Sequence, residues 1–361
     1  MPELLKNMYN CDSLSTFAAQ IKAVHQSFKA DEFLNSIMDE TWDSLELKGR
    51  GKQITANLGK FLPQDYPAAL KILDQVAHKQ EGFFGIIFPD FVETYGQEEK
   101  YWDLSIAALE LYTRYSSSEF AVRPFIIKHE ERMMAQMLAW AKHENEHVRR
   151  LASEGCRPAL PWAQALPKYK KDPTPVLQIL EVLKKDPSLY VRKSVANNLN
   201  DISKTHPGLV AKIAKEWYGK NKDTDWIVKH GCRTLLKKGN RDVLAIFGYN
   251  NADVADVEAF AIESDKVIFG ENLIFSFAIN AKEATKVRLE YAIDFMKANG
   301  KQNRKIFQLL ESTMKANEKR QYVKAHAFVD LSTRKHYPGL HAVELMVNGV
   351  GQGKLEFEVT I

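Results

Sequence analysis

The chain has few cysteines, no long apolar run and only a small excess of charge. Its three cysteines, Cys11, Cys156 and Cys232, lie far apart and form neither a disulfide framework nor a CxxC metal motif. No apolar run approaches the roughly 18 to 20 residues that span a bilayer. The start of the chain, MPELLKNMYN, lacks the basic and apolar segments of a secretory signal. We therefore expect a cytoplasmic protein with no membrane association.

Familiar catalytic and metal-binding motifs are also missing. The stretch GRGK at residues 49–52 lacks the spacing of a phosphate-binding GxxxxGK[ST] loop. His143 and His147 are four residues apart, but HENEH is not HExxH and no third ligand is evident. We therefore predict no metal site and no cofactor.

The composition indicates a folded chain with an uneven charge distribution. Hydrophobic residues make up 45% of the 361 residues and charged residues 27%, which excludes global disorder and favours two or three domains. The net charge is +4, but residues 119–250 carry 24 Lys and Arg against 14 Asp and Glu, a balance of +10. A basic segment between acidic flanks suggests a polyanionic partner, although a solvated helical surface explains it equally well.

Residues 1–250 have the apolar spacing of helices joined by short polar turns. A Val-Arg or Val-Lys pair opens four helical segments, at Val122, Val148, Val191 and Val228, with intervals of 26, 43 and 37 residues. Small and apolar residues follow each pair at helical spacing, a pattern that resembles HEAT repeats. Helix pairs of this size bury their faces by stacking. The pattern predicts an irregular α-helical solenoid.

After residue 254 the apolar spacing becomes alternating. About seven strand-like runs follow, and Asn299-Gly300 and Asn348-Gly349 supply typical hairpin turns. Seven short antiparallel strands in about 100 residues predict an immunoglobulin-like sandwich, without the usual Cys–Trp–Cys core. The predicted fold class is therefore mainly α: a HEAT-like helical solenoid over residues 1–250, followed by a C-terminal immunoglobulin-like β-sandwich over residues 254–361.

Acidic and aromatic residues stand out within the basic segment. They are Glu119, Glu154, Trp162 and Asp201, with Arg149, Arg150 and Arg157 around them. Each has an ordinary structural explanation, such as helix capping, an ion pair with a neighbouring arginine or packing between repeats. Their clustering among cations is harder to explain in this way, because carboxylates repel DNA phosphates and do not help a surface that only binds phosphate.

Three segments carry a resemblance to a known family: SSSEFAVRPFI (116–126), HENEHVRRLASEGCRPALPW (143–162) and SLYVRKSVANNLND (188–201). Together with the stretch at 45–70 and the strand-rich tail, they make the chain similar to the AlkC-type family of bacterial DNA alkylation-repair glycosylases over nearly its whole length. One departure is Ala159, where the family pattern predicts a basic residue. Its absence removes one possible phosphate contact.

The resemblance implies that Glu119, Glu154, Trp162 and Asp201 line the site for the damaged nucleotide, with Arg150 and Arg157 beside them on the DNA. It implies excision of N3-methylated bases, chiefly 3-methyladenine and 3-methylcytosine, without a deep base pocket. Such bases are cationic and leave as neutral molecules, so they need no general acid. Carboxylates then stabilise the oxocarbenium-like transition state and orient the attacking water. Because no nucleophilic lysine is identifiable, we expect a monofunctional glycosylase.

The immunoglobulin-like tail has an implied role of its own. In the family reading it clamps the duplex, with Arg304 and Lys305 in the basic cluster that contacts DNA. The expected partner is alkylated double-stranded DNA, bound by a monomer that needs no protein partner. The alternative, from a different class, is a non-catalytic HEAT-repeat scaffold that binds nucleic acid or protein.

Overall fold

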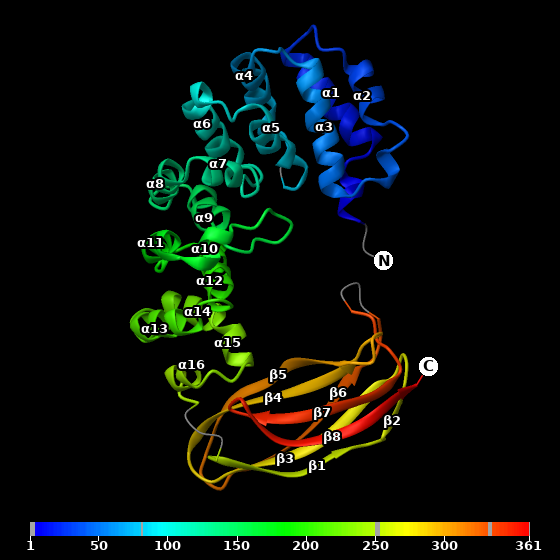
Figure 1. Cartoon of the computed structure of the whole chain (residues 1–361), viewed down its shortest axis with the longest axis vertical. Coiled ribbons are helices and arrows are strands. Elements are labelled where there is room, and N and C mark those ends of the chain that lie inside the picture. The colour runs from blue at the N-terminus through cyan, green and yellow to red at the C-terminus, as the bar shows by residue number, and fades with distance from the viewer. Residues whose placement is uncertain (1–3, 81, 250–252, 331–333, 361) are drawn as a thin grey trace. The chain divides into compact units, whose positions relative to one another are not determined.

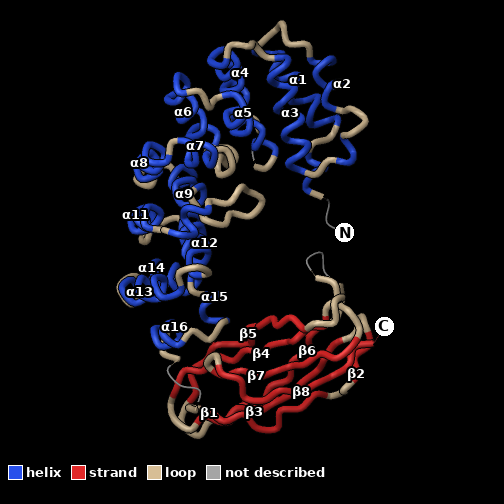
Figure 2. Tube along the Cα trace, in the orientation of Figure 1, coloured by secondary structure: helices blue, strands red, loops and turns tan. Residues whose placement is uncertain are grey.

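The computed structural model describes residues 4–80, 82–249, 253–330 and 334–360. The described residues up to 249 form helices, and those from 253 onward form strands (Figures 1 and 2). The predicted fold class is therefore confirmed. The predicted boundary at residues 250–254 includes residues 250–252, which lie outside the described residues.

The helical part consists of successive short and medium-length helices. The α-helices are α1 (Cys11–Val24), α2 (Ala30–Ile37), α3 (Leu47–Phe61), α4 (Tyr66–Ala77), α5 (Ile87–Tyr95), α6 (Trp102–Tyr112), α7 (Val122–Lys128), α8 (Glu130–Trp140), α9 (Glu146–Gly155), α10 (Pro167–Lys171), α11 (Thr174–Leu183), α12 (Leu189–Ser203), α13 (Pro207–Trp217), α14 (Lys222–Gly231), α15 (Arg233–Lys237) and α16 (Arg241–Ile246). Short 3-10 helices lie at Leu5–Met8, Trp42–Ser44, Phe84–Ile86 and Glu99–Tyr101. Among the described helices, none is long and apolar enough to cross a membrane.

The repeated Val-Arg pairs mark the helices that stack on one another. They lie in α7, α9, α12 and α14, and α9 and α12 begin where Asn145 and Ser188 accept hydrogen bonds from backbone amides in the first turn of the helix. The valines are buried, and further apolar residues follow them at helical spacing. The sequence repeat therefore identifies the inner helices of the stack.

The arginines of these pairs connect neighbouring repeats. Arg149 in α9 binds Asp186 with two hydrogen bonds, from Nε at 2.6 Å and from Nη2 at 3.1 Å. Arg192 in α12 donates to the carbonyls of Asp186 and Pro187 and lies 3.4 Å from Asp223 at the start of α14. Each arginine thus ties its own helix to the residues that begin the next inner helix.

The strands form two sheets. They are β1 (Ala255–Ile262), β2 (Lys266–Ile268), β3 (Asn272–Ala281), β4 (Thr285–Met296), β5 (Gln302–Met314), β6 (Lys319–Ala327), β7 (Gly339–Val347) and β8 (Val350–Thr360). One sheet has the order β1-β3-β6 and the other β2-β8-β7-β4-β5. The core between them is built of aromatic and branched side chains, including Phe275, Tyr291, Phe295 and Phe328.

The strand-like run at residues 266–280 is divided into β2 and β3 at Gly270, so the described residues form eight strands where about seven were expected. The φ of 98° at Gly270, a residue type that favours turns, lets the chain pass from one sheet to the other. The resulting β2 pairs in parallel with β8, so the sandwich is not wholly antiparallel. Asn348 and Gly349 both have positive φ in the β7–β8 hairpin, as the Asn-Gly signal predicts.

The chain divides into two compact units. Residues 1–205 and 221–231 form the first, and residues 206–220 and 232–361 form the second. The second unit therefore contains α13, α15 and α16 together with both sheets. Every carboxylate and aromatic residue singled out in the basic segment belongs to the first unit.

Candidate active site

Three carboxylates and two arginines from successive repeats form a line of alternating charge. The line runs through Glu119, Arg150, Glu154, Arg157 and Asp201, and we call it the charge chain. Glu119 precedes α7, the next three residues lie on α9 and its C-terminal end, and Asp201 lies in the last turn of α12. Stacking of these helices brings into direct contact partners that are up to 44 residues apart in the sequence, as Arg157 and Asp201 are.

Glu119 forms one end of the charge chain. Its Oε2 atom accepts a hydrogen bond from Ser117 Oγ at 2.8 Å and pairs with Arg150 Nη1. Arg150 also donates to Ser117 Oγ at 2.9 Å, and its guanidinium lies 5.1 Å from the ring centre of Tyr190. The carboxylate is therefore held by side chains and does not cap α7.

Glu154 lies at the centre and uses both of its oxygens. Oε1 accepts from Arg157 Nη1 at 2.6 Å and lies 3.5 Å from Arg150 Nη2. Oε2 accepts from Ser194 Oγ at 2.6 Å, and Ser153 Oγ lies 2.6 Å from the same hydroxyl. Only 6% of the Glu154 side chain is exposed, so these partners replace the water that it loses.

Asp201 forms the other end. Its Oδ2 atom accepts from Arg157 Nε at 2.9 Å, and Oδ1 accepts from Lys204 Nζ at 2.9 Å. The Asp201 side chain is 2% exposed, whereas that of Lys204 is 49% exposed. A buried carboxylate therefore has one buried cation and one surface cation as partners.

The charge chain keeps its arginines protonated. Burial alone lowers the pKa of Arg150, but the charges of Glu119 and Glu154 outweigh it and raise that pKa. At Arg157, burial also lowers the pKa of the guanidinium, but the charges of Glu154 and Asp201 outweigh burial and raise that pKa. The carboxylates are thus held at defined places by cations that stay charged.

Trp162 lies in the loop between α9 and α10 and is 63% exposed. This exposure argues against packing between repeats as the reason for the tryptophan. Its φ is 62°, in the left-handed region that costs a residue with a β-carbon about 1 kcal/mol or more. An exposed indole on a strained backbone favours a binding role.

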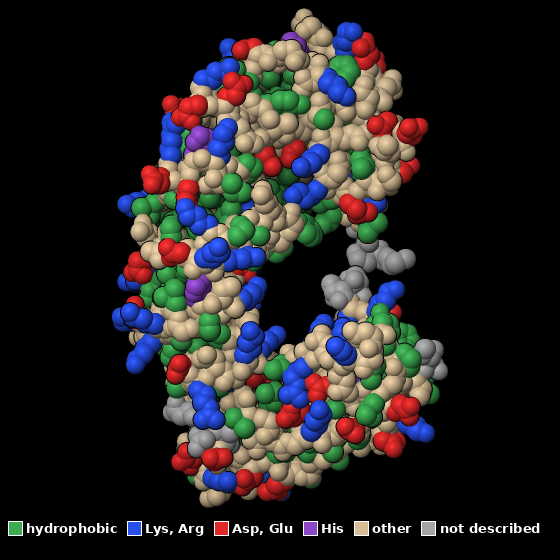
Figure 3. All heavy atoms as spheres, in the orientation of Figure 1, with side chains coloured by type: hydrophobic (Ala, Val, Ile, Leu, Met, Phe, Trp, Pro, Cys, Tyr) green, Lys and Arg blue, Asp and Glu red, His purple; other side chains and the backbone are tan. Residues whose placement is uncertain are grey.

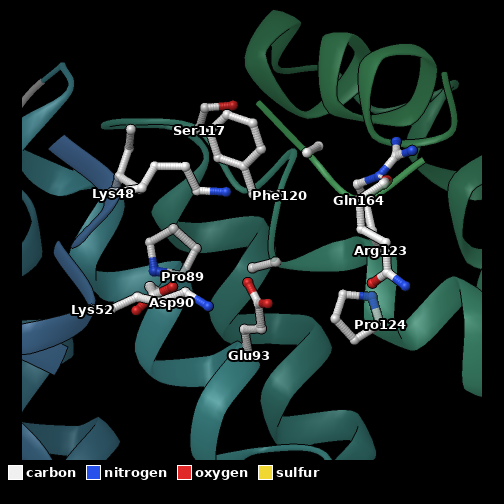
Figure 4. A pocket seen from close by; sticks show the side chains of 13 residues that line it. Lys48, Lys52, Pro89, Asp90, Glu93, Ser117, Phe120, Arg123, Pro124 and Gln164 are labelled. Carbon is white, nitrogen blue, oxygen red and sulfur yellow. Dashed lines mark hydrogen bonds between the residues drawn. The ribbon is translucent and has the colours of Figure 1, made fainter. Parts of the chain in front are cut away.

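A pocket of about 50 Å³ adjoins the Glu119 end of the charge chain (Figure 4). Lys48 and Lys52 enter it from α3, Asp90 and Glu93 from α5, and Ser117 and Phe120 from the loop before α7. Burial raises the pKa of Asp90 and of Glu93, although the two lysines oppose this. Charged side chains from α3 and α5 thus face one another across this small pocket.

Three further predicted DNA contacts lie elsewhere. Arg149 uses its side chain between α9 and the residues before α12, as described above, and does not join the charge chain. In the second unit, Arg304 on β5 binds Asp294 at 2.8 Å and Glu344 at 2.6 Å, and its hydrogen bond holds the pKa of Asp294 at about 2. Lys305 is half-buried, and burial with nearby Arg334 and Lys297 lowers its pKa. Their contact with DNA stays a prediction.

Sequence reasoning missed several residues that support the predicted ones. Ser117, Phe120, Tyr190, Ser194 and Lys48 contact either the charge chain or the Trp162 loop. Ser117 and Phe120 flank Glu119 in the printed motif and were within reach of the sequence argument. Lys48 has no local signal, because it lies 114 residues from its partner.

The charged side chains are unevenly placed on the visible face of the helices. Lys and Arg side chains gather along the right-hand edge of the middle and lower helices, whereas Asp and Glu are mixed with them along the left-hand edge (Figure 3). Within the described residues, no three His, Cys, Asp or Glu side chains are placed to hold a metal ion. The distinctive chemistry of the helical unit is therefore the buried charge chain.

The fold and the site define a class of two-part protein. A stack of helical repeats holds the charge chain, and an immunoglobulin-like sandwich follows it in the chain. A family model described as DNA alkylation repair enzyme matches residues 112–242, which contain the whole charge chain. A second, described as the C-terminal Ig-like domain of uncharacterised protein YhaZ, matches residues 256–361.

Two relatives match almost the whole chain. The uncharacterized protein YhaZ of Bacillus subtilis (strain 168) is 49% identical over 355 residues, which cover 98% of this chain and 99% of YhaZ. The alkylpurine DNA glycosylase AlkC of Pseudomonas fluorescens, solved bound to DNA containing an abasic site analog, is 36% identical. Its TM-score is 0.96, with 99% of this chain and 100% of that chain covered. The chain belongs to the AlkC-type DNA alkylation-repair family, as the resemblance predicted.

Proposed function

We propose that this protein is a monofunctional DNA glycosylase that excises 3-methyladenine and 3-methylcytosine from duplex DNA. The observation that carries the proposal is the charge chain, because it holds three carboxylates at defined positions inside a repeat unit with a basic sequence. A surface that only bound phosphate would gain nothing from buried carboxylates. The likeness to a glycosylase solved on abasic DNA supports the same conclusion.

The residue types suit the departure of a cationic base. The N3-methylated base takes the glycosidic electron pair and leaves as a neutral molecule, so its departure requires no proton donor. Positive charge then develops on the deoxyribose, where a carboxylate held in advance stabilises it without reorganisation. We assign this role to Glu119 and Asp201, with water attack oriented by one of them, and the same kind of role to Glu154.

The arginines of the charge chain have a second role in this proposal. In the free protein Arg150 and Arg157 compensate the carboxylates. When DNA binds, its phosphates compete for the same guanidiniums, which are well suited to bidentate phosphate binding. Partial transfer of each arginine to the DNA leaves the carboxylate charge available to the sugar. The exposed Trp162 offers its ring face to the same cation.

The small pocket supports excision without base flipping. Flipping enzymes extrude the whole nucleotide into a fitted pocket. The pocket beside Ser117, at the Glu119 end of the charge chain, has a volume of only about 50 Å³. Substrate choice then depends on the weak glycosidic bond of a cationic lesion, and we expect neutral lesions to be left in place.

The remaining parts of the proposal concern the whole chain. Residues 1–250 bind the damaged duplex and release the base, and residues 254–361 clamp the duplex through Arg304 and Lys305. The extra contacts of the clamp offset the cost of bending DNA, which is a few kcal/mol. We propose that the protein acts as a monomer on alkylated double-stranded DNA, without a protein partner, metal or cofactor.

The test is release of free bases from methylated duplex DNA, separated by chromatography under single-turnover conditions. We expect wild-type protein to release 3-methyladenine and 3-methylcytosine and leave intact abasic strands. Glu119→Gln and Asp201→Asn should each slow release by about 10²- to 10³-fold, the loss typical of one charge-stabilising group. Glu131→Gln, which alters an exposed carboxylate on α8, is the matched control and should not change the rate.

The other outcomes are also informative. Release that persists in both variants would move the site away from the charge chain. Strand cleavage at the abasic site would show a lyase step and contradict the monofunctional assignment. DNA binding without any base release would favour the non-catalytic scaffold. Binding measured over a range of salt concentrations does not separate these cases, because both functions use cations.

A further inference from the structure

The turn that carries Trp162 has an unusual residue at its third position. The amide of Ala163 donates to the carbonyl of Leu160 at 3.3 Å, so residues 160–163 form a four-residue turn with Pro161 second and Trp162 third. A positive φ at the third position after proline is the arrangement of a type II turn, which normally has glycine or asparagine there. A tryptophan adopts it only where its surroundings hold the backbone in place.

Lys48 provides that hold from a distant part of the chain. Its Nζ atom donates a hydrogen bond to the carbonyl of Trp162 at 2.8 Å, across 114 residues. The same ammonium lies 4.6 Å from the ring centre of Phe120, the neighbour of Glu119. On the other side of the loop, Arg123 Nε donates to the carbonyl of Gln164 at 2.6 Å. The loop is therefore bonded on both sides of the indole.

We propose that Lys48 is a positioning residue that couples Trp162 to the Glu119 end of the charge chain. One ammonium contacts the tryptophan backbone and the face of Phe120, and both aromatic residues line a small pocket with Lys48. This arrangement holds the exposed indole ready for the damaged nucleotide. The proposal rests on the proposed function, because it assigns Trp162 a place in base release.

Lys52 is a control that distinguishes a positioning role of Lys48 from a purely electrostatic role. It lies one helical turn after Lys48 on α3 and lines the same two pockets. Both lysines oppose the rise in the pKa of Asp90 and Glu93, so they affect the local charge in the same sense. In the described part of the chain, the hydrogen bond to the Trp162 loop comes from Lys48 and not from Lys52. A purely electrostatic role predicts equal effects for the two lysines.

The test compares Lys48→Met, Lys48→Arg, Lys52→Met, Trp162→Ala and the double variant Lys48→Met/Trp162→Ala. Single-turnover release of 3-methyladenine is measured for each, with thermal melting to verify folding. We expect Lys48→Met to slow release by about 10- to 100-fold, because a small displacement of a group that contacts the substrate can slow a reaction by this much. Lys48→Arg should recover most of the rate, and Lys52→Met should slow release clearly less than Lys48→Met does. The double variant should be no slower than Trp162→Ala alone.

A second readout does not depend on activity. Iodide quenching of Trp162 fluorescence is isolated as the difference between each protein and its Trp162→Phe counterpart. We expect Lys48→Met, but not Lys52→Met, to change the quenching constant, because only the first releases the loop.

Three results would overturn the inference. Lys48→Met and Lys52→Met could slow release equally, or the double variant could be slower than Trp162→Ala by the factor that Lys48→Met causes alone. The third is a quenching constant that Lys48→Met leaves unchanged. If the wild-type protein releases no base, the proposed function fails. The quenching arm then still decides whether Lys48 holds the loop.

Discussion

Replacing Arg157 by methionine should destabilise the helical unit more than any other single change in the charge chain. Within the described residues, Arg157 is the one member that binds two carboxylates at 2.9 Å or less, Glu154 at the end of α9 and Asp201 on α12. Methionine retains much of the apolar stem and removes every donor. Glu154 and Asp201, which are 6% and 2% exposed, then each lose a buried cation.

The expected size follows from the burial of both partners. Breaking a buried ion pair by removing one partner costs about 3–5 kcal/mol, because it leaves an uncompensated charge. With roughly 2–4 °C per kcal/mol for a domain of this size, the melting temperature should fall by about 6–20 °C. The free energy of unfolding is measured by urea denaturation followed by circular dichroism, and the melting temperature by calorimetry.

Lys204→Met is the matched control. Lys204 binds the same aspartate at 2.9 Å, but its side chain is 49% exposed, and exposed pairs contribute about 0–1 kcal/mol. Adding Glu154→Gln to Arg157→Met should restore part of the loss, since it removes one of the unpaired charges. Two results would refute the reasoning: a loss below about 1 kcal/mol in Arg157→Met, or equal losses in the two cation variants.

Four further predictions test other parts of the molecule. Burial lowers the pKa of His326 to about 4 from an ordinary 6.5, so the unfolded chain takes up more protons between these values and stability falls as the pH drops from about 7 to 4. Melting at several pH values should show a loss of about 3 kcal/mol from this residue, absent in His326→Phe. The free energy of unfolding of Trp162→Gly should be about 1 kcal/mol higher than that of Trp162→Ala, because glycine adopts a φ of 62° without strain. Urea denaturation measures the difference, and equal midpoints would contradict the prediction. Gly155→Ala places a β-carbon 2.6 Å from Val122 Cγ2 and should cost about 1–3 kcal/mol by the same denaturation assay. Lys305→Gln should reduce the slope of log affinity for duplex DNA against log salt by about 1, and an unchanged slope would remove Lys305 from the interface.

Part of the candidate site was open to sequence reasoning. Glu119, Glu154 and Asp201 were chosen from their place in a basic segment, and the structure brings all three into one charge chain. The choice of Trp162 agrees with its exposure. Arg149 was grouped with the same residues because it precedes Arg150, but on a helix adjacent side chains point about 100° apart. One side chain therefore faces Asp186 and the other Glu119.

The helical repeats, the change to strands and the Asn-Gly hairpin turn can be predicted from the sequence, because each depends on spacing within a few residues. Sequence reasoning also selected the three carboxylates that the structure joins in the charge chain. The long-range partners follow from the tertiary structure alone: Arg157 with Asp201, 44 residues apart, and Lys48 with Trp162, 114 residues apart. The same is true of β2, which pairs in parallel with β8 before Gly270 turns the chain into the other sheet. Such contacts follow from how repeats stack and sheets pair, and local patterns do not record the rotation from one repeat to the next.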